Sequence, residues 1–278
     1  MQQVDWHSPA HLLEQLIRHE AVHEIDGWDD LRRRLQPDRR CFAFFHPQLP
    51  DEPLIFVEVA LLPEMPATIA PLIDKHAQPT LTPSQYKVAA FYSISNCQPG
   101  LRGVSLGNFL IKRVAEQLQR ELPQLKRFCT LSPIPGFAKW LLSPGEAPGD
   151  ARKGNSERLT AAREHLLATT DGNLGALADA TRLQSLNDTD REALSRLCAA
   201  YLVQHSATPQ GDAVARFHLD NGARLERLNL LGDLSRKGVK QSFGMMVNYL
   251  YDLHKIEASH EQFVNGKVAH SRTVASLI

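Results

Sequence analysis

The spacing of apolar residues predicts two short helices at the start of the chain and three strands after them. Apolar residues at positions 12, 13, 16 and 17 fall on one helical face, and Ser8-Pro9 is expected to begin that helix. A second helix is expected over 29–35. Three runs that are rich in Phe, Val, Ile or Ala are expected to be strands: 41–45, 54–61 and 87–95.

Beyond position 95 the pattern changes from strand to helix and back to strand. A glycine-containing turn leads into an amphipathic helix over 108–122, which Pro123 ends, and a fourth strand is expected over 126–131. Strand, turn, helix and strand in this order predict a βαβ-type unit and an α/β fold. The Pro/Gly-rich run 143–149 and the helical stretch 155–205 indicate a helical insertion over about 143–207.

Composition narrows the functional classes. The chain has 278 residues and a formal net charge of zero, with 31 basic and 31 acidic residues, so it lacks the basic surplus expected of a general nucleic-acid-binding protein. Its four cysteines form no C-x-x-C pair, which suits a reducing cytoplasm. The N-terminus lacks a signal-peptide pattern, and no apolar run is long enough to span a bilayer. A cytoplasmic protein without membrane partners is therefore expected.

One loop has the composition of a phosphate-binding turn. Small residues at a strand-to-helix turn let backbone N–H groups approach a pyrophosphate closely. The same composition is also typical of an ordinary strand-to-helix turn that binds no ligand. The segment resembles the R/Q-x-x-G-x-G/A loop of the GNAT acyltransferase superfamily, with Ser105 in place of the central glycine. The candidate residues are Arg102, Gly103, Val104, Ser105, Leu106, Gly107 and Asn108.

A second motif, His19-Glu20-Ala21-Val22-His23, matches the H-E-x-x-H pattern of zinc metalloproteases. A catalytic zinc needs a third protein ligand, and no following helix offers an obvious one. The motif also lies at the expected end of the first helix, so no metal is expected.

Ser132 and His218 are ambiguous from local sequence alone. Ser132 follows a strand and precedes a helix, where it could project into a cleft or simply cap the helix with Pro133 at its first position. His218 lies among apolar residues, as structural histidines commonly do.

Taken together, several strings resemble the malonyl-CoA decarboxylase family. They occur in the family's order and cover nearly the whole chain: EAVH with GWDDLRRRL, FYSISNCQPGLRGVSLGNFLIKRV, FCTLSPIPGFAKWL, FHLDNGARLERLN and GVKQSFGMMVNYLYDL.

This resemblance implies a GNAT-like mixed sheet flanked by helices, with one catalytic domain over 1–278 and a helical lead-in over about 1–40. It implies that Ser132 and His218 are catalytic, that 102–108 binds the coenzyme A pyrophosphate, and that Tyr251 lines the site. The helical N-terminal domain of the family is absent from this sequence, so a monomer or homodimer is expected.

The implied reaction is the decarboxylation of malonyl-CoA to acetyl-CoA and CO2 through a thioester enolate. The thioester carbonyl accepts the electrons that departing CO2 leaves, so no cofactor is expected. Two alternatives stay open: a GNAT-type transfer of an acyl group from coenzyme A to an amine or alcohol, and acyl-CoA binding without turnover.

Overall fold

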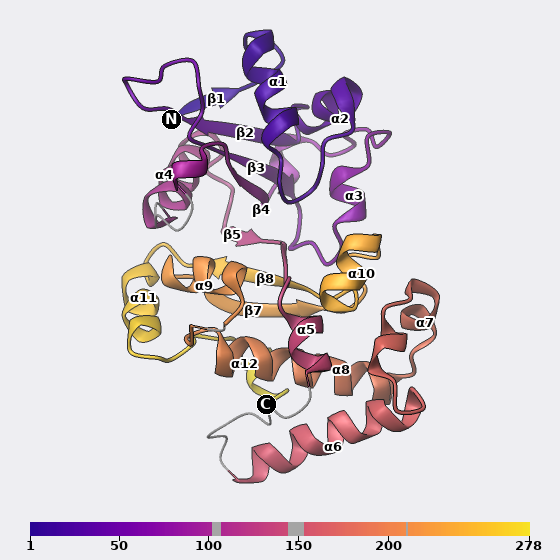
Figure 1. Cartoon of the computed structure of the whole chain (residues 1–278). Coiled ribbons are helices and arrows are strands. Elements are labelled where there is room, and N and C mark those ends of the chain that lie inside the picture. The colour runs from indigo at the N-terminus through magenta and orange to yellow at the C-terminus, as the bar shows by residue number, and fades with distance from the viewer. Residues whose placement is uncertain (102–106, 144–152, 210) are drawn as a thin grey trace. The chain divides into compact units, whose positions relative to one another are not determined.

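The computed structural model describes residues 1–101, 107–143, 153–209 and 211–278 (Figure 1). The chain divides into two compact units, Met1–Leu131 (unit 1) and Ser132–Ile278 (unit 2). Each contains its own strands and helices. Within the described residues, no helix is both long and apolar enough to cross a membrane.

Unit 1 is built on a mixed sheet. Strands β1 to β4 pair in chain order and antiparallel, whereas β4 and β5 are parallel. The parallel pair is joined through helix α4, as the βαβ-type pattern predicts. The strands are β1 (Gln2–Val4), β2 (Arg39–Phe44), β3 (Ile55–Leu62), β4 (Val88–Asn96) and β5 (Arg127–Thr130). The helices are α1 (Ala10–His19), α2 (Gly27–Arg34), α3 (Ala70–Ile73) and α4 (Gly107–Glu121), with 3-10 turns at Pro83–Gln85 and Pro99–Leu101.

Helices α1 and α2 cover one face of this sheet (Figure 1). Their apolar side chains form a core with the β2 and β3 side chains that point the same way. Strand side chains alternate between faces, so the intervening residues point to the opposite face. The core on the α1/α2 side contains Val4, Leu12, Leu13, Leu16, Ile25, Leu31, Cys41, Ala43, Phe56 and Cys97.

A buried ion-pair network ties α2 to this face. The Arg34 guanidinium donates to Asp30 Oδ1 at 2.9 Å and to Glu58 Oε2 at 3.0 Å, and its side chain is fully buried. Removing one member of such a network leaves an unpaired buried charge, which costs about 3–5 kcal/mol. The network therefore fixes α2 against β3.

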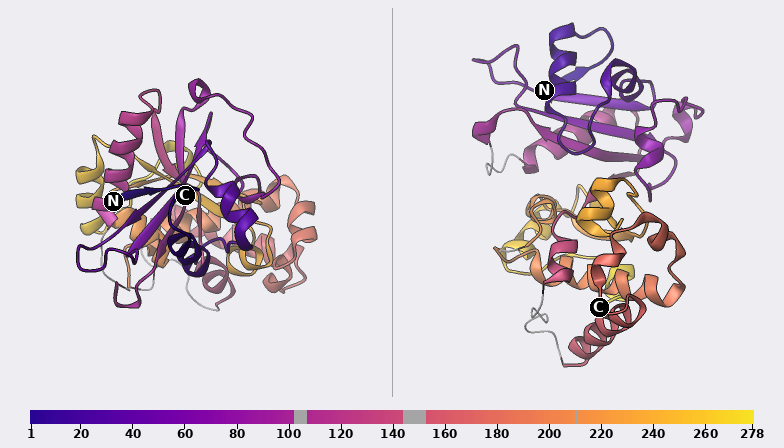
Figure 2. Two further views of the ribbon diagram at one scale, coloured as in Figure 1. Left: turned by 90° about the horizontal axis from the view of Figure 1, so that it is seen from above. Right: turned by 45° about the vertical axis from the view of Figure 1, so that its right-hand side comes forward.

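Unit 2 combines a small antiparallel sheet with many helices (Figure 2). Strand β8 pairs with β6 on one side and β7 on the other. The strands are β6 (Ser132–Pro133), β7 (Arg224–Asn229) and β8 (Met246–Tyr251). The α-helices are α5 (Phe137–Leu142), α6 (Lys153–Thr169), α7 (Ala180–Ser185), α8 (Asp188–Ala200), α9 (Ala213–Asp220), α10 (Arg236–Ser242), α11 (Ile256–Val264) and α12 (Arg272–Ala275).

The segment from α6 to α8 is helical, and α6 packs along α8. A 3-10 turn at Leu174–Leu177 precedes α7, and α8 continues into a π-helical turn at Tyr201–His205. This turn places Tyr201 against two aromatic side chains of α5, with ring centroids 5.9 Å from Phe137 and 5.2 Å from Trp140. The contacts hold α5 against the end of α8.

The predicted α/β class, with a mixed sheet flanked by helices, is confirmed, and three local features differ from the sequence pattern. The first helix begins at Ala10, with Pro9 rather than Ser8 at the N-cap. Ser132 does not cap a helix, because it lies in β6 and α5 begins only at Phe137. The short strand β1 and the polar strand β7 were not foreseen, because neither shows a clear apolar alternation.

Candidate active site

Strand pairing fixes the position of Ser132 in unit 2. Ser132 lies opposite Val247 in the antiparallel β6–β8 pair. Residues directly opposite each other point to the same face of a sheet, and side chains two apart along a strand share a face. Ser132 therefore shares one face with Tyr249 and Tyr251 of β8.

Helix α9 brings His218 to that face. The helix begins at the N-cap Asp212, whose side chain accepts hydrogen bonds from the backbone N–H groups of Val214 and Ala215, each at 3.0 Å. Its buried residues, Ala215, His218 and Leu219, have the i, i+3, i+4 spacing of one helical face. His218 thus points inward with the apolar side of α9.

The helix ends where the chain needs a glycine. Gly222 has φ +76°, and a Cβ there would lie 2.3 Å from the carbonyl oxygen of Ile256. The close approach holds the end of α9 against the first turn of α11. The helix that carries His218 is therefore fixed at both ends.

The three side chains form a continuous hydrogen-bonded chain. Ser132 Oγ lies 3.0 Å from His218 Nε2, and His218 Nδ1 lies 2.9 Å from the Tyr251 hydroxyl. The imidazole also stacks on the Tyr249 ring, with centroids 4.7 Å apart and planes at 27°. Both ring nitrogens are therefore oriented by oxygen partners, and the ring plane is fixed by an aromatic neighbour.

Burial sets the charge state of this site. His218 is 5% exposed, and the loss of solvation lowers its pKa to about 3. Burial also raises the pKa of the Tyr251 hydroxyl well above its ordinary value. At neutral pH the imidazole and the phenol are both uncharged. The imidazole then carries one N–H. The three hydrogen-bonded side chains can therefore pass a proton in either direction, according to which ring nitrogen carries that hydrogen.

Asp212 connects the start of α9, the helix that carries His218, to the turn that follows Ser132. Its Oδ1 caps α9, while its Oδ2 accepts a hydrogen bond at 2.8 Å from the backbone N–H of Gly136, four residues after Ser132. Burial raises the pKa of Asp212, although the three backbone N–H donors oppose that rise. A side chain at position 136 would collide with the Tyr201 hydroxyl, 2.1 Å from an added Cβ. The carboxylate therefore holds the segment 132–136, called the Ser132 loop below, to the start of α9.

The predicted pyrophosphate loop falls mostly outside the described residues. Arg102, Gly103, Val104, Ser105 and Leu106 are not described. Gly107 and Asn108 are the first residues of α4, as the expected turn-to-helix transition requires. Their role toward coenzyme A stays a prediction.

The H-E-x-x-H motif does not adopt the geometry that zinc binding needs. Helix α1 ends at His19, so His19 and His23 do not share a helical face. The Glu20 carboxylate instead accepts hydrogen bonds from the backbone N–H groups of Val22 and His23 and from the hydroxyls of Ser93 and Ser95. Among the described residues, no three His, Cys, Asp or Glu side chains could hold a metal ion together.

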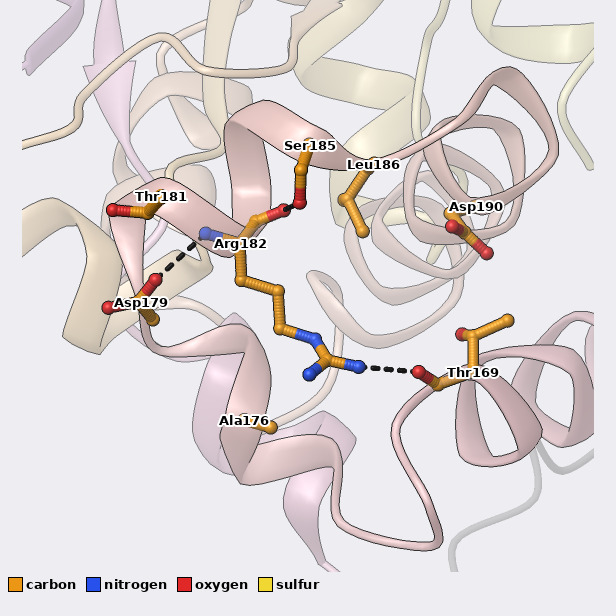
Figure 3. Close-up of a pocket in the computed structure, with 8 residues that line it drawn as sticks. All are labelled: Thr169, Ala176, Asp179, Thr181, Arg182, Ser185, Leu186 and Asp190. Carbon is orange, nitrogen blue, oxygen red and sulfur yellow. Dashed lines mark hydrogen bonds between the residues drawn. The ribbon is translucent and has the colours of Figure 1, made fainter.

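A pocket of about 500 Å³ lies among the helices of unit 2, away from Ser132 and His218 in sequence (Figure 3). The Arg182 side chain reaches across it and donates to the carbonyl oxygen of Thr169, while Asp179 caps α7 and Asp190 pairs with His165. Because these groups hydrogen-bond to their own neighbours, they connect α6, α7 and α8. The polar groups that line this pocket therefore serve to hold the three helices together.

Sequence reasoning did not single out Asp212, Gly136 or Tyr249. An aspartate directly before an apolar helical face is a recognisable N-cap signal, so the cap of α9 could have been foreseen. The second bond of Asp212, to Gly136, joins positions 76 residues apart and has no local signal. Tyr249 could have been found only by pairing its strand with β6.

A family model of the malonyl-CoA decarboxylase C-terminal domain matches residues 1–278. The chain is 39% identical over 292 residues to the mitochondrial malonyl-CoA decarboxylase of Mus musculus and 38% identical to that of Anser anser anser. It is wholly covered in both alignments but spans only 58% and 57% of those relatives. A solved malonyl-CoA decarboxylase from Rhodopseudomonas palustris is 49% identical with a TM-score of 0.82, covering 99% of this chain and 65% of that one.

Proposed function

The chain belongs to the malonyl-CoA decarboxylase family, and from that membership we propose that it converts malonyl-CoA to acetyl-CoA and CO2. The observation that carries the proposal is the buried chain Ser132–His218–Tyr251, with contacts of 3.0 and 2.9 Å. It can supply a proton in a site that excludes water, which is what the second half of this reaction requires.

The first half of the reaction needs little covalent help. When the C–C bond to the carboxylate breaks, its electron pair moves toward the thioester carbonyl, and CO2 leaves an enolate of acetyl-CoA. A buried, water-poor site favours this step because it desolvates the carboxylate while leaving the charge-delocalised enolate less penalised. The electron sink belongs to the substrate, so the proposed route uses no cofactor.

The second half requires a proton at carbon. His218 is neutral in the unliganded protein because burial lowers its pKa to about 3. A malonyl carboxylate placed beside it would raise that pKa, since a nearby negative charge favours the imidazolium. We assign the proton to His218 Nε2, from which it passes through the Ser132 hydroxyl to the enolate carbon. His218 takes up this proton from solvent as the malonyl carboxylate binds. When the proton is delivered, serine has gained and lost one proton and histidine returns to its neutral form.

A covalent acyl-serine route is disfavoured by the partner of Nδ1. In a serine–histidine–carboxylate triad, a carboxylate holds Nδ1 and stabilises the imidazolium. Here Nδ1 faces the uncharged Tyr251 hydroxyl. Tyr251 orients the ring without supplying the negative charge that would stabilise the imidazolium formed when an attacking serine is deprotonated. We therefore treat Tyr251 as a positioning residue and Ser132 as a proton carrier.

The decisive experiment incubates the full chain with malonyl-CoA in D2O without any acyl acceptor. We expect acetyl-CoA with deuterium in its methyl group, because the enzyme protonates a carbanion after CO2 has left. An acyltransferase would instead release free coenzyme A and only when an amine or alcohol is present. Intact malonyl-CoA, or acceptor-dependent consumption, would disprove the decarboxylase proposal.

Variants of the pair test its role. Ser132→Ala and His218→Ala should each lower kcat by about two to four orders of magnitude, the range for losing general acid–base help. The double variant should be little worse than the poorer single one, because the two side chains act as one unit. Additive losses would mean that the two side chains act independently.

A further inference from the structure

A basic groove lies on the surface of unit 2 between α5 and α10, which pack against each other. Its cavity volume is about 640 Å³, within the range of small-ligand sites. It is lined by Pro135, Lys139, Arg236, Lys237, Lys240 and Gln241. Pro135 lies three residues after Ser132, so one wall of the groove continues from the Ser132 loop.

The lining is strongly cationic although the chain as a whole is not. Four of its six residues are Lys or Arg and none is acidic, whereas the net charge of the whole chain is zero. Elsewhere many cations are paired: Arg33 with Asp38, Arg34 with Asp30, and Arg196 with Glu192. The side chains of Lys139, Arg236 and Lys240 make no hydrogen bond or ion pair with any residue in the described ranges.

The acid nearest in sequence does not neutralise the groove. Asp233 precedes α10, and its carboxyl lies under Gly238, where an added Cβ would be 2.3 Å from Asp233 Cγ. At 100° per residue, Gly238 lies on the opposite side of the helix from Arg236 and Lys240. The side chains of Lys139, Arg236 and Lys240 therefore have no internal counter-charge among the described residues, and a bound anion would relieve the repulsion among them.

We propose that this groove binds the phosphate groups of a nucleotide-like anion. Lys and Arg side chains are the usual phosphate ligands in proteins, and several of them converge on one concave surface. The volume exceeds what a single phosphate needs, and Pro135 together with the aliphatic lysine stems can cover an apolar ring. The shared chemistry is a phosphorylated nucleoside, either the 3′-phosphoadenosine end of a coenzyme A thioester, which rests on the proposed function, or a separate nucleotide.

The test measures binding of adenosine 3′,5′-bisphosphate to the full chain by calorimetry. Lys139 and Lys240 are both exposed, so Lys139→Gln with Lys240→Gln should fold normally. We expect the double variant to bind at least about tenfold more weakly, since charge-assisted bonds to phosphate are strong. The control is Lys126→Gln with Lys267→Gln, which removes the same charge from exposed positions outside the groove.

Unchanged affinity in the groove variant, or an equal loss in the control, would overturn the proposal. The affinity for coenzyme A itself distinguishes the two sources: weaker binding of coenzyme A in the groove variant assigns the groove to the coenzyme, and unchanged binding assigns it to a separate nucleotide. Binding needs no turnover. A chain that binds the bisphosphate through Lys139 and Lys240 but leaves malonyl-CoA intact would disprove the proposed function alone.

Discussion

The Tyr251 hydroxyl is a single polar group whose removal should separate orientation from proton transfer. Tyr251→Phe keeps the buried ring but leaves His218 Nδ1 without its partner at 2.9 Å. Losing the partner of a buried polar group costs about 1–3 kcal/mol, so we expect kcat to fall by about ten- to a hundredfold. The KM for malonyl-CoA should change little, which steady-state kinetics would measure.

Tyr92→Phe is the matched control. Tyr92 is as deeply buried, on β4 of unit 1, and its hydroxyl has no hydrogen-bond partner among the described residues. Removing that hydroxyl should leave kcat unchanged. An equal fall in both variants would show that loss of a buried hydroxyl, rather than loss of the His218 contact, lowers the rate.

Burial of His218 also predicts how stability depends on pH. The folded-state pKa is about 3, below the ordinary value near 6.5. Above pH about 6.5 the neutral ring makes its full contribution to the free energy of unfolding. This contribution is lost as the pH falls toward 3, because between these pH values the unfolded protein binds a proton that the folded protein does not. From pH 7 to pH 5, the free energy of unfolding should fall by roughly 2 kcal/mol more in the wild type than in His218→Gln.

Urea denaturation at the two pH values measures that difference. His7→Gln serves as the control, because the His7 side chain is 94% exposed and should give the wild-type pH dependence. A constant gap between the wild type and His218→Gln at both pH values would mean that the folded protein protonates His218 as readily as the unfolded chain.

At the scale of elements, Asp212 is the contact on which the site geometry depends. Asp212→Ala removes the cap of α9, which costs about 0.5–2 kcal/mol, and also the acceptor of the Gly136 N–H. We expect a lower melting temperature and a kcat lowered about tenfold or more, since Ser132 and His218 lose their common anchor.

Asp179→Ala is the matched control for this prediction. Asp179 caps α7 through the backbone N–H of Arg182 at 2.8 Å, and within the described residues its side chain makes no hydrogen bond to residues 132–136. It should lower the stability of the fold through loss of a helix cap while leaving kcat near the wild-type value. If both variants lose activity equally, a general loss of stability, rather than loss of the link between α9 and the Ser132 loop, explains the effect of Asp212→Ala.

Elements with a strong local pattern were predictable, and those fixed by pairing were not. The alternation and apolar content of β2, β3 and β4 and the amphipathic face of α4 gave their positions to within about two residues. Strand β6 has only two residues, Ser132 and Pro133, and exists because β8 lies beside it. Serine followed by proline is a common start of a helix. Local sequence therefore allowed a helix cap at Ser132, where the structure has a strand.

The candidate site shows the same division between local and distant information. Ser132 and His218 were chosen through the family resemblance, since neither has a distinctive local pattern. Their contact spans 86 residues and depends on β8, α9 and Asp212 together. No periodicity of the sequence contains that information. The fold class was predictable because it depends on many short-range patterns that agree.

At the scale of the whole molecule, each of the two units has its own structural anchors. Unit 1 depends on the α1/α2 core and the Arg34 network, and unit 2 on the aromatic contacts between α5 and the end of α8. The Ser132–His218–Tyr251 chain lies entirely in unit 2. Destabilising changes in the unit 1 core should therefore affect the hydrogen bonds among these three side chains less than changes to Asp212 do.

The four buried cysteines allow local unfolding of the protein to be measured by the rate at which each thiol is labelled. Cys41, Cys97 and Cys129 lie in unit 1 and Cys198 in unit 2, and none forms a disulfide. Burial raises the pKa of the Cys97 thiol to about 12 and raises the pKa values of Cys41 and Cys198 well above the ordinary thiol value. Alkylating reagents can therefore reach a reactive thiolate only after local opening. If the two units open separately, mass spectrometry of timed labelling should give one rate for the three unit 1 thiols and a different rate for Cys198. Equal rates at all four positions would mean that the chain opens as one cooperative body.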